Sequence, residues 1–268
     1  MVPARKALAA VGLAAHDWID DARRTLEFVG QVLLALGRFA RGQARVRAAD
    51  LVWQLDQSGP RSLPIVALVS GLVGVILAYM GAVQLQRFGA QIYIADLVTV
   101  GAVREIAALM TGVILSGRIG AAFAAQLGSM QANEEIDALR ALGVEPVEHL
   151  VLPRLVALVL VAPLLTAFAA LVAVLAGGLV AVSVFGIVPA EYAHQSLRAL
   201  TLAHVNVGLF KGTVYALLVG LAGCRQGLHA GRSAQAVGQA VTASVVQSIV
   251  WIVVAASALT VAFQKLNW

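Results

Sequence analysis

Charged residues are sparse in this chain, but a dense set of them lies between two long apolar segments, in residues 116–146. Asn133 is a favourable N-cap residue, and the acidic residues that follow it suit the positive end of a helix dipole. Gly143 and Pro146 then signal the end of the helix. The pattern predicts a short amphipathic helix that presents carboxylates to a partner; the alternative is a solvated connector between two spans.

Arg104 and Glu105 form the second group of interest, because they open a predicted membrane span. Adjacent charges at that depth are costly unless they are paired or face water, so they are candidates for a functional site. The alternative is an interfacial pair that only anchors the end of the helix. Lys211, in a later span, is expected to extend its ammonium outward to the interface.

The sequence lacks the usual motifs for nucleotide hydrolysis, nucleophilic catalysis and metal binding. The chain has no Walker motif, no nucleophile elbow and no clustered metal ligands, and Cys224 is its single cysteine. The glycine-rich stretch 225–238 lacks the G-x-x-x-x-G-K-[ST] pattern and follows no strand, so we expect no nucleotide site there. His194 and His204 lack metal-ligand spacing. We therefore expect neither catalysis nor a metal site on this chain.

The composition is that of a membrane protein. Of the 268 residues, 60% are hydrophobic and 12% are charged, and the mean hydropathy is +0.87. The pI of about 9.9 does not indicate nucleic-acid binding, because the basic residues gather near the ends of apolar segments. We predict an all-α membrane protein in which residues 1–62 form a cytoplasmic region and residues 63–268 a five-span domain. The predicted spans are 63–86, 104–123, 155–185, 205–224 and 244–263.

The segments between the spans are assigned from their polarity. Residues 17–42 are predicted to form an amphipathic helix in the cytoplasmic interface, or else a small soluble cap on the bundle. Residues 48–64 are predicted as a polar connector, 87–103 as an outer re-entrant or interfacial piece, and 186–204 as an outer loop. Arg45 and Trp268 are expected at the membrane–water interface.

The orientation follows from the basic residues. With a cytoplasmic N-terminus and five spans, only Arg87, Arg104, Arg198, Lys211 and Lys265 fall on the outer side, which leaves 14 of the 19 basic residues inside. This asymmetry agrees with the positive-inside rule.

Two stretches carry a family resemblance. GRIGAAFAAQLGSM followed by EEIDALRALGVEP resembles the signature of the MlaE/YrbE permeases of ABC transporters, GR-x-GA-x-x-AAELG-x-M-x-x-x-EQIDAL-x-x-x-G-x-x-P. Gln126 and Glu135 depart from it, standing where the family usually has Glu and Gln. The stretch RQGLHAGRSAQAVG is similar to the family's second signature at Gly227, Ala236 and Gly238.

The resemblance implies a permease subunit that moves phospholipid or a related lipid between the inner membrane and a periplasmic conduit. It implies a homodimer, a separate ABC ATPase that binds the ATP, an MCE-domain lipid-binding protein and often a STAS-domain subunit. This chain would carry no cofactor and would lie in the bacterial inner membrane with its N-terminus in the cytoplasm. The alternatives are an ion-gradient-driven secondary transporter of a hydrophobic solute, disfavoured because the mid-span stretches are almost uncharged, and a membrane scaffold.

The resemblance also implies roles for two groups of residues. The cytoplasmic coupling helix, residues 126–142, would dock into a groove of the ATPase. Its residues are Gly128, Met130, Glu134, Glu135, Ile136, Asp137, Leu139 and Arg140. The lipid-binding residues would be Leu77, Leu85, Phe88, Arg104 and Glu105.

Overall fold

The computed structural model of the chain describes residues 2–42 and 47–266, and this part consists of helices and turns without a strand. The predicted interfacial residues Arg45 and Trp268 lie outside it. In chain order, the helical elements are α1 (Val2–Ala40), α2 (Ala48–Ser58), η1 (Pro60–Ser62), α3 (Leu63–Gln86), η2 (Gln91–Tyr93), α4 (Ile94–Gly101), η3 (Ala102–Ile106), α5 (Ala107–Leu115), η4 (Ser116–Gly120), α6 (Ala121–Ala132), α7 (Glu135–Ala141), η5 (Val147–Val151), α8 (Leu152–Ser183), α9 (Pro189–Ala199), α10 (Leu202–Leu228) and α11 (Ala234–Lys265).

Within the described residues, five helical stretches are long and apolar enough to cross a membrane, which confirms the predicted all-α class with five spans. They are Ala48–Gln86, Ile94–Ala132, Val147–Ser183, Leu202–Leu228 and Ala234–Lys265. Each extends beyond the segment predicted from hydropathy. Helices continue past their apolar part wherever the polar residues at their ends find partners, so hydropathy alone underestimates their length.

The predicted polar connector at residues 48–64 is wrong, because most of it is helical. Residues 48–58 form α2, which packs on α8 and is separated from α3 only by a kink at Gly59. The amide of Gly59 still donates to the carbonyl of Leu55 (2.8 Å), and Pro60 starts the short helix η1. Proline suits the first turn of a helix, so here it redirects the chain without ending the helical stretch.

The outer segments are also more helical than predicted. Residues 94–103 do not form a separate re-entrant piece, since α4 continues through the π-helical turn η3 into α5. The predicted outer loop at 186–204 contains α9, which has proline at its N-terminus, Glu191 in its first turn and Arg198 in its last. These are favourable helix-end residues that the sequence analysis did not use. Tyr192 of α9 is buried and donates to the carbonyl of Val174 (3.0 Å).

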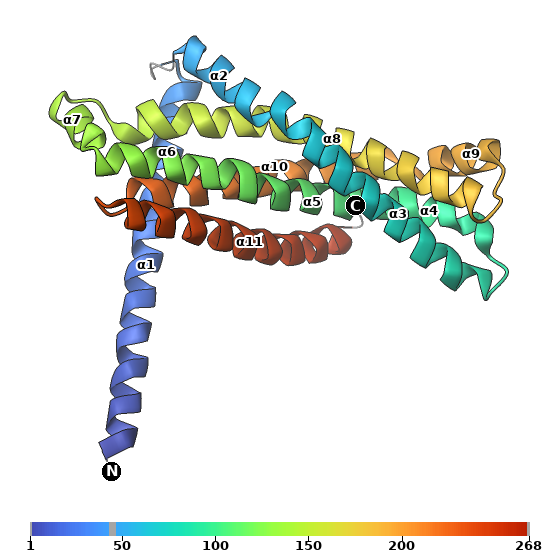
Figure 1. Cartoon of the computed structure of the whole chain (residues 1–268), viewed down its shortest axis with the longest axis horizontal. Helices are drawn as coiled ribbons and strands as arrows, with labels where there is room; N and C mark the ends of the chain where they lie inside the picture. The colour runs from blue at the N-terminus through green and yellow to red at the C-terminus, as the bar shows by residue number, and fades with distance from the viewer. Residues whose placement is uncertain (1, 43–46, 267–268) are drawn as a thin grey trace.

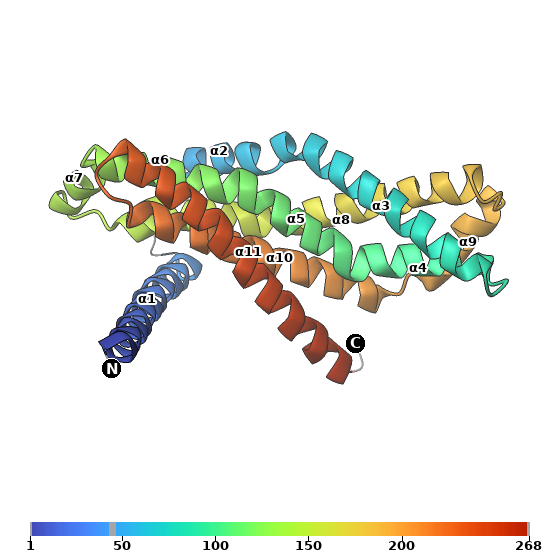
Figure 2. The same ribbon diagram turned by 60° about the horizontal axis from the view of Figure 1, so that its bottom comes forward.

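The spans pack side by side, and α10 lies among the others (Figure 1). It is the most buried of the five spans, whereas α11 is the least buried and diverges from the bundle toward its C-terminal end (Figure 2). Close helix approach depends on glycine. At Gly74 of α3, a β-carbon would overlap the backbone of Ala173 in α8. Small residues allow this contact between helices in lipid, where dispersion packing drives association.

Helix α1 runs across the direction of the spans and reaches the bundle at the end that carries α7 (Figure 1). Phe28, Val32 and Ala35 are buried in the main core of the bundle. Two polar contacts hold α1 in place: Arg225 at the end of α10 donates to Asp21, and Arg38 pairs with Glu145 and Glu148 (3.5 and 3.4 Å). The helix is longer than the predicted segment 17–42, and its placement in the membrane interface remains a prediction.

The contact at Gly74 yields a stability prediction. We expect Gly74→Ala to lower the free energy of unfolding by about 1–3 kcal/mol, the usual cost of overpacking, because α3 has to move away from α8. The measurement is the thermal unfolding of the purified protein in detergent. Gly71→Ala, one turn earlier, is the matched control, since a β-carbon there makes ordinary contacts with the side chains of Val172 at 3.6 Å and Ala176 at 3.9 Å. Equal midpoints for both variants would contradict this account.

Candidate functional site

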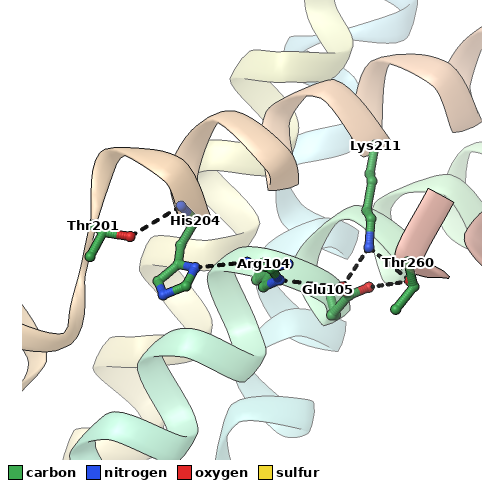
Figure 3. A network of polar contacts seen from close by, with 6 residues as sticks. All are labelled: Arg104, Glu105, Thr201, His204, Lys211 and Thr260. Carbon is green, nitrogen blue, oxygen red and sulfur yellow. Dashed lines mark hydrogen bonds and ion pairs between the residues drawn. The ribbon is translucent and has the colours of Figure 1, made fainter. Parts of the chain in front are cut away.

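A group of polar side chains lies inside the spans, where η3, α10 and α11 meet (Figure 3). Nζ of Lys211 donates to Oε1 of Glu105 (2.5 Å) and to Oγ1 of Thr260 (2.9 Å). Oγ1 of Thr260 in turn donates to Oε2 of Glu105 (3.3 Å). The side chain of Lys211 is 0% exposed, whereas that of Glu105 is 36% exposed. The ammonium is therefore fully enclosed, and its carboxylate partner reaches the surface of the bundle.

Arg104 extends this group toward the N-terminal end of α10. Its Nη1 donates to Nδ1 of His204 (3.1 Å), and its Nε lies 3.9 Å from Oε1 of Glu105. A guanidinium has no acceptor, so Nδ1 of His204 must accept this bond, and the neutral ring therefore carries its proton on Nε2. Thr201, the N-cap of α10, accepts a bond from the amide of His204 (3.4 Å). We call Arg104, Glu105, His204, Lys211 and Thr260 the intramembrane polar cluster.

The π-helical turn η3 presents Arg104 and Glu105. Such turns are rare interruptions of α-helices and occur frequently at functional sites. Helix α10 approaches η3 closely because Gly208 lies directly against the carbonyl of Val103, where no side chain would fit. His204 and Lys211 lie about one helical turn before and after this glycine on α10. The close approach thus brings both within reach of the two charges on η3.

The expected outward extension of Lys211 is wrong. Its ammonium points into the bundle and is bonded to Glu105 and Thr260. A lysine inside an apolar span is itself a signal of function, and following that signal would have placed Lys211 in the site from the start. His204 and Thr260 carried no comparable signal, because isolated histidines and threonines are common near helix ends.

The predicted lipid-binding residues fall into separate places. Arg104 and Glu105 belong to the polar cluster, but Leu77 and Leu85 are half-buried against an apolar cluster of α3, α4, α8 and α9. Phe88 follows the end of α3 and is 82% exposed.

At the opposite end of the bundle, the predicted acidic helix is α7, and it is held by an arginine from the α10–α11 turn. Arg232 donates from Nη1 to Glu134 (3.0 Å) and from Nη2 to Asp137 (2.9 Å). Asp137 also accepts from Arg140 (3.0 Å). We call these contacts the Arg232 clamp. It joins the two stretches that carry the family resemblance, which are about 95 residues apart in sequence.

The start of α7 differs from the prediction. Glu134, not Asn133, is the N-cap residue, and it has a left-handed conformation with φ of +61°. Asn133 ends α6 instead and donates from its side chain to Glu135 (3.3 Å). A left-handed backbone costs an L-residue energy, so bonds from Arg232 to the Glu134 side chain offset strain at this turn. The predicted C-terminal glycine, Gly143, does have positive φ (+75°).

The remaining predicted coupling residues lie near this clamp. Ile136 is fully buried, and Met130 and Leu139 are partly buried. Gly128 lies against Ala230 of the α10–α11 turn and Val237 of α11. Glu135 and Arg140 are exposed. Gln126, where the family usually has Glu, accepts a hydrogen bond from Arg154 (3.3 Å) without an ion pair.

No cluster of three or more histidine, cysteine, aspartate or glutamate side chains is placed to hold a metal ion in the described residues. The chain is a multi-pass helical membrane protein with a charged cluster inside its spans, an arrangement that is typical of membrane transport proteins.

Comparison with known proteins gives the family. The family model described as Permease MlaE matches residues 51–262. A probable ABC transporter permease protein of Synechocystis is 31% identical over 232 residues, which cover 87% of this chain and 86% of the relative. Another, from Rickettsia typhi, is 33% identical over 201 residues, covering 75% and 78%. Protein TRIGALACTOSYLDIACYLGLYCEROL 1 of Arabidopsis thaliana is 31% identical over 229 residues, covering 84% and 63%. The chain belongs to the MlaE permease family, and it is an ABC transporter permease.

The Lys211–Glu105 pair yields a second prediction. We expect Glu105→Gln to destabilise the protein by about 3 kcal/mol or more, because it leaves a buried ammonium without its counter-charge. The double variant with Lys211→Met should be closer to the wild type, because it removes both charges. A double-mutant cycle on the thermal unfolding of these variants and of Lys211→Met measures the coupling. Purely additive effects would show that the two charges do not interact.

Proposed function

We propose that the chain is the membrane subunit of a lipid-transporting ABC system, working as a homodimer with two copies of a separate ATPase. The observation that carries this proposal is a charged cluster inside the spans of an MlaE-family permease. The name of the Arabidopsis relative refers to a diacylglycerol glycolipid, which supports a lipid as the cargo. The phospholipid class, the bacterial inner membrane and the cytoplasmic N-terminus are part of the proposal.

The lipid would be held at the outer part of the spans. We assign its head to Arg104 and Glu105 and its tails to Leu77, Leu85 and Phe88. Phe88 is strongly exposed in one copy, and a second copy of the chain would complete the wall around it. An MCE-domain protein would receive or deliver the lipid on that side, and a STAS-domain subunit would bind on the cytoplasmic side.

The coupling to the ATPase would pass through α7. Because Glu134 and Asp137 are already bonded to Arg232, motion of α7 is transmitted directly to the turn that starts α11. The exposed Glu135 and Leu142, which is 77% exposed, are then the side chains most available to the ATPase. Helix α1 would lie in the cytoplasmic interface, since it runs across the spans at the same end as α7 (Figure 1).

The second candidate is a secondary transporter driven by an ion gradient. The enclosed Lys211–Glu105 pair favours it, because ionisable pairs inside spans occur in proton and ion pathways. The expectation that the mid-span stretches carry almost no charge is therefore too simple for this chain. Its homologues are ABC permeases, however, and the partner proteins distinguish the two candidates.

A copurification experiment tests the proposed function. We expect tagged protein, purified in mild detergent from its native membrane, to bring down an ATPase subunit and an MCE-domain protein identified by mass spectrometry. In proteoliposomes, this complex should move lipid only with ATP. A dimer that copurifies with no ATPase, and moves its solute with an ion gradient alone, would replace this proposal with the second candidate.

The Arg232 clamp provides a test of the coupling. Asp137→Arg should reduce ATP-driven lipid transport by about tenfold or more, by adding repulsion between three arginines at the clamp. Adding Arg232→Glu should restore part of the transport, because the introduced carboxylate and guanidinium can pair, while the bond to Glu134 is lost. Glu135→Lys is the control for direct contact with the ATPase, and it should weaken ATPase binding with the clamp intact. If the swap restores nothing, Asp137 does not act through Arg232.

A further inference from the structure

An apolar cavity lies beside the polar cluster. A cavity of about 280 Å³ is enclosed by α4, η3, α8, α9 and α10. Its lining is almost entirely apolar and includes Val103, Leu171, Leu197, Val205 and Leu209. Leu171 and Leu197 are 57% and 73% exposed, so the wall of this cavity reaches the outer surface of the bundle. We call it the α9 cavity, since residues of α9 form its outer wall.

An apolar lining alone would not select a ligand here. Lipid tails are as apolar as leucine, so an acyl chain gains little hydrophobic free energy by leaving the bilayer for such a cavity. Any preference for a particular molecule must come from polar groups at the cavity. The α9 cavity has two kinds of such groups.

The first is the Arg104–His204 contact. Val103 and Val205 line the cavity, and their chain neighbours Arg104 and His204 make the 3.1 Å bond that joins η3 to α10. The guanidinium side chain is 19% exposed. A cationic group that adjoins an apolar cavity matches an amphiphile with a phosphate head, because guanidinium binds phosphate oxygens in a fork geometry.

The second is a pair of buried hydroxyls. Thr99 and Thr166 line the cavity, are 2% and 1% exposed, and make no hydrogen bond to any residue that the structure describes. Buried polar groups without a partner are uncommon and call for an explanation. Each hydroxyl is a donor, and the ester oxygen of a lipid in the cavity would be an available acceptor.

We propose that the α9 cavity binds one acyl chain of a glycerophospholipid, with the phosphate toward Arg104 and an ester oxygen toward Thr99 or Thr166. Phosphate, ester and acyl chain occur together in this class of lipid, whereas a galactolipid has no phosphate. The inference rests on the proposed lipid transport and deepens it. It adds a path for one acyl chain within a single subunit, apart from Leu77, Leu85 and Phe88.

The test uses the complete transporter in proteoliposomes with two photoreactive lipids, phosphatidylglycerol and a digalactosyl diacylglycerol, each with a diazirine at the end of one chain. After irradiation, mass spectrometry measures the label on residues 196–209. We expect phosphatidylglycerol to label this segment about tenfold more than the galactolipid, which corresponds to 1.4 kcal/mol of preference. Equal labelling by the two lipids in the wild type would overturn the proposal without any variant.

The variant Ala167→Trp provides a second, independent test of the cavity assignment. Ala167 lines the cavity from an exposed position of α8, so the indole can fill the cavity without displacing a buried residue. We expect about a tenfold loss of phosphatidylglycerol labelling, equivalent to the same 1.4 kcal/mol. Leu175→Trp, at an exposed position of α8 that does not line the cavity, is the matched control and should label as the wild type. Unchanged labelling in Ala167→Trp would overturn the proposal.

The failure of this inference is distinguishable from that of the proposed function. ATP-driven lipid transport by the wild type together with non-selective labelling removes the cavity assignment and leaves the permease role intact. Loss of lipid transport in the wild-type complex removes both.

Discussion

The ammonium of Lys211 is enclosed by a helical bundle that lies in hydrocarbon, so the bundle itself has to supply every partner of that charge. Glu105 and Thr260 do so from two other spans. Desolvation of a charge is costly, and attraction to a partner offsets it only with good geometry and further hydrogen bonds. The close approach of α10 to η3 at Gly208 is therefore a condition for burying Lys211 at all.

Ion pairs between distant segments occur at both ends of the bundle, but they lie in different environments. Toward the end that carries α9, charged side chains lie among apolar helices and are joined into one cluster. At the other end, Arg232 bonds two carboxylates of α7 on the exposed surface, where a single ion pair contributes little to stability. The Arg232 clamp instead links two parts of the chain. It joins α7, between the second and third spans, to the turn before the fifth span.

The sequence predicted those features that depend on local composition. The five spans follow from long apolar runs, and Gly143 follows from the chemistry of helix ends. The partner of Lys211 could not be predicted, because Glu105 is 106 residues away and only the packing of α10 on η3 brings them together. The helices α2 and α9 were missed because their polar residues resemble those of loops. Their helical structure depends on tertiary contacts, namely the packing of α2 on α8 and the burial of Tyr192 of α9. At Glu134, contacts with Arg232 outweigh the local preference for an asparagine cap.

The separation of Glu105 and Lys211 along the chain also bears on biogenesis. Ribosomal synthesis delivers the second span to the membrane well before the fourth, so Glu105 must enter without the lysine that later neutralises it. A lone acidic residue at the centre of a span costs about 2.5–3.5 kcal/mol during insertion. The partial exposure of Glu105 and the arginine next to it allow that carboxylate to stay hydrated until the fourth span arrives. Burial of the Lys211–Glu105 pair is thus complete only when the fourth span packs against the second.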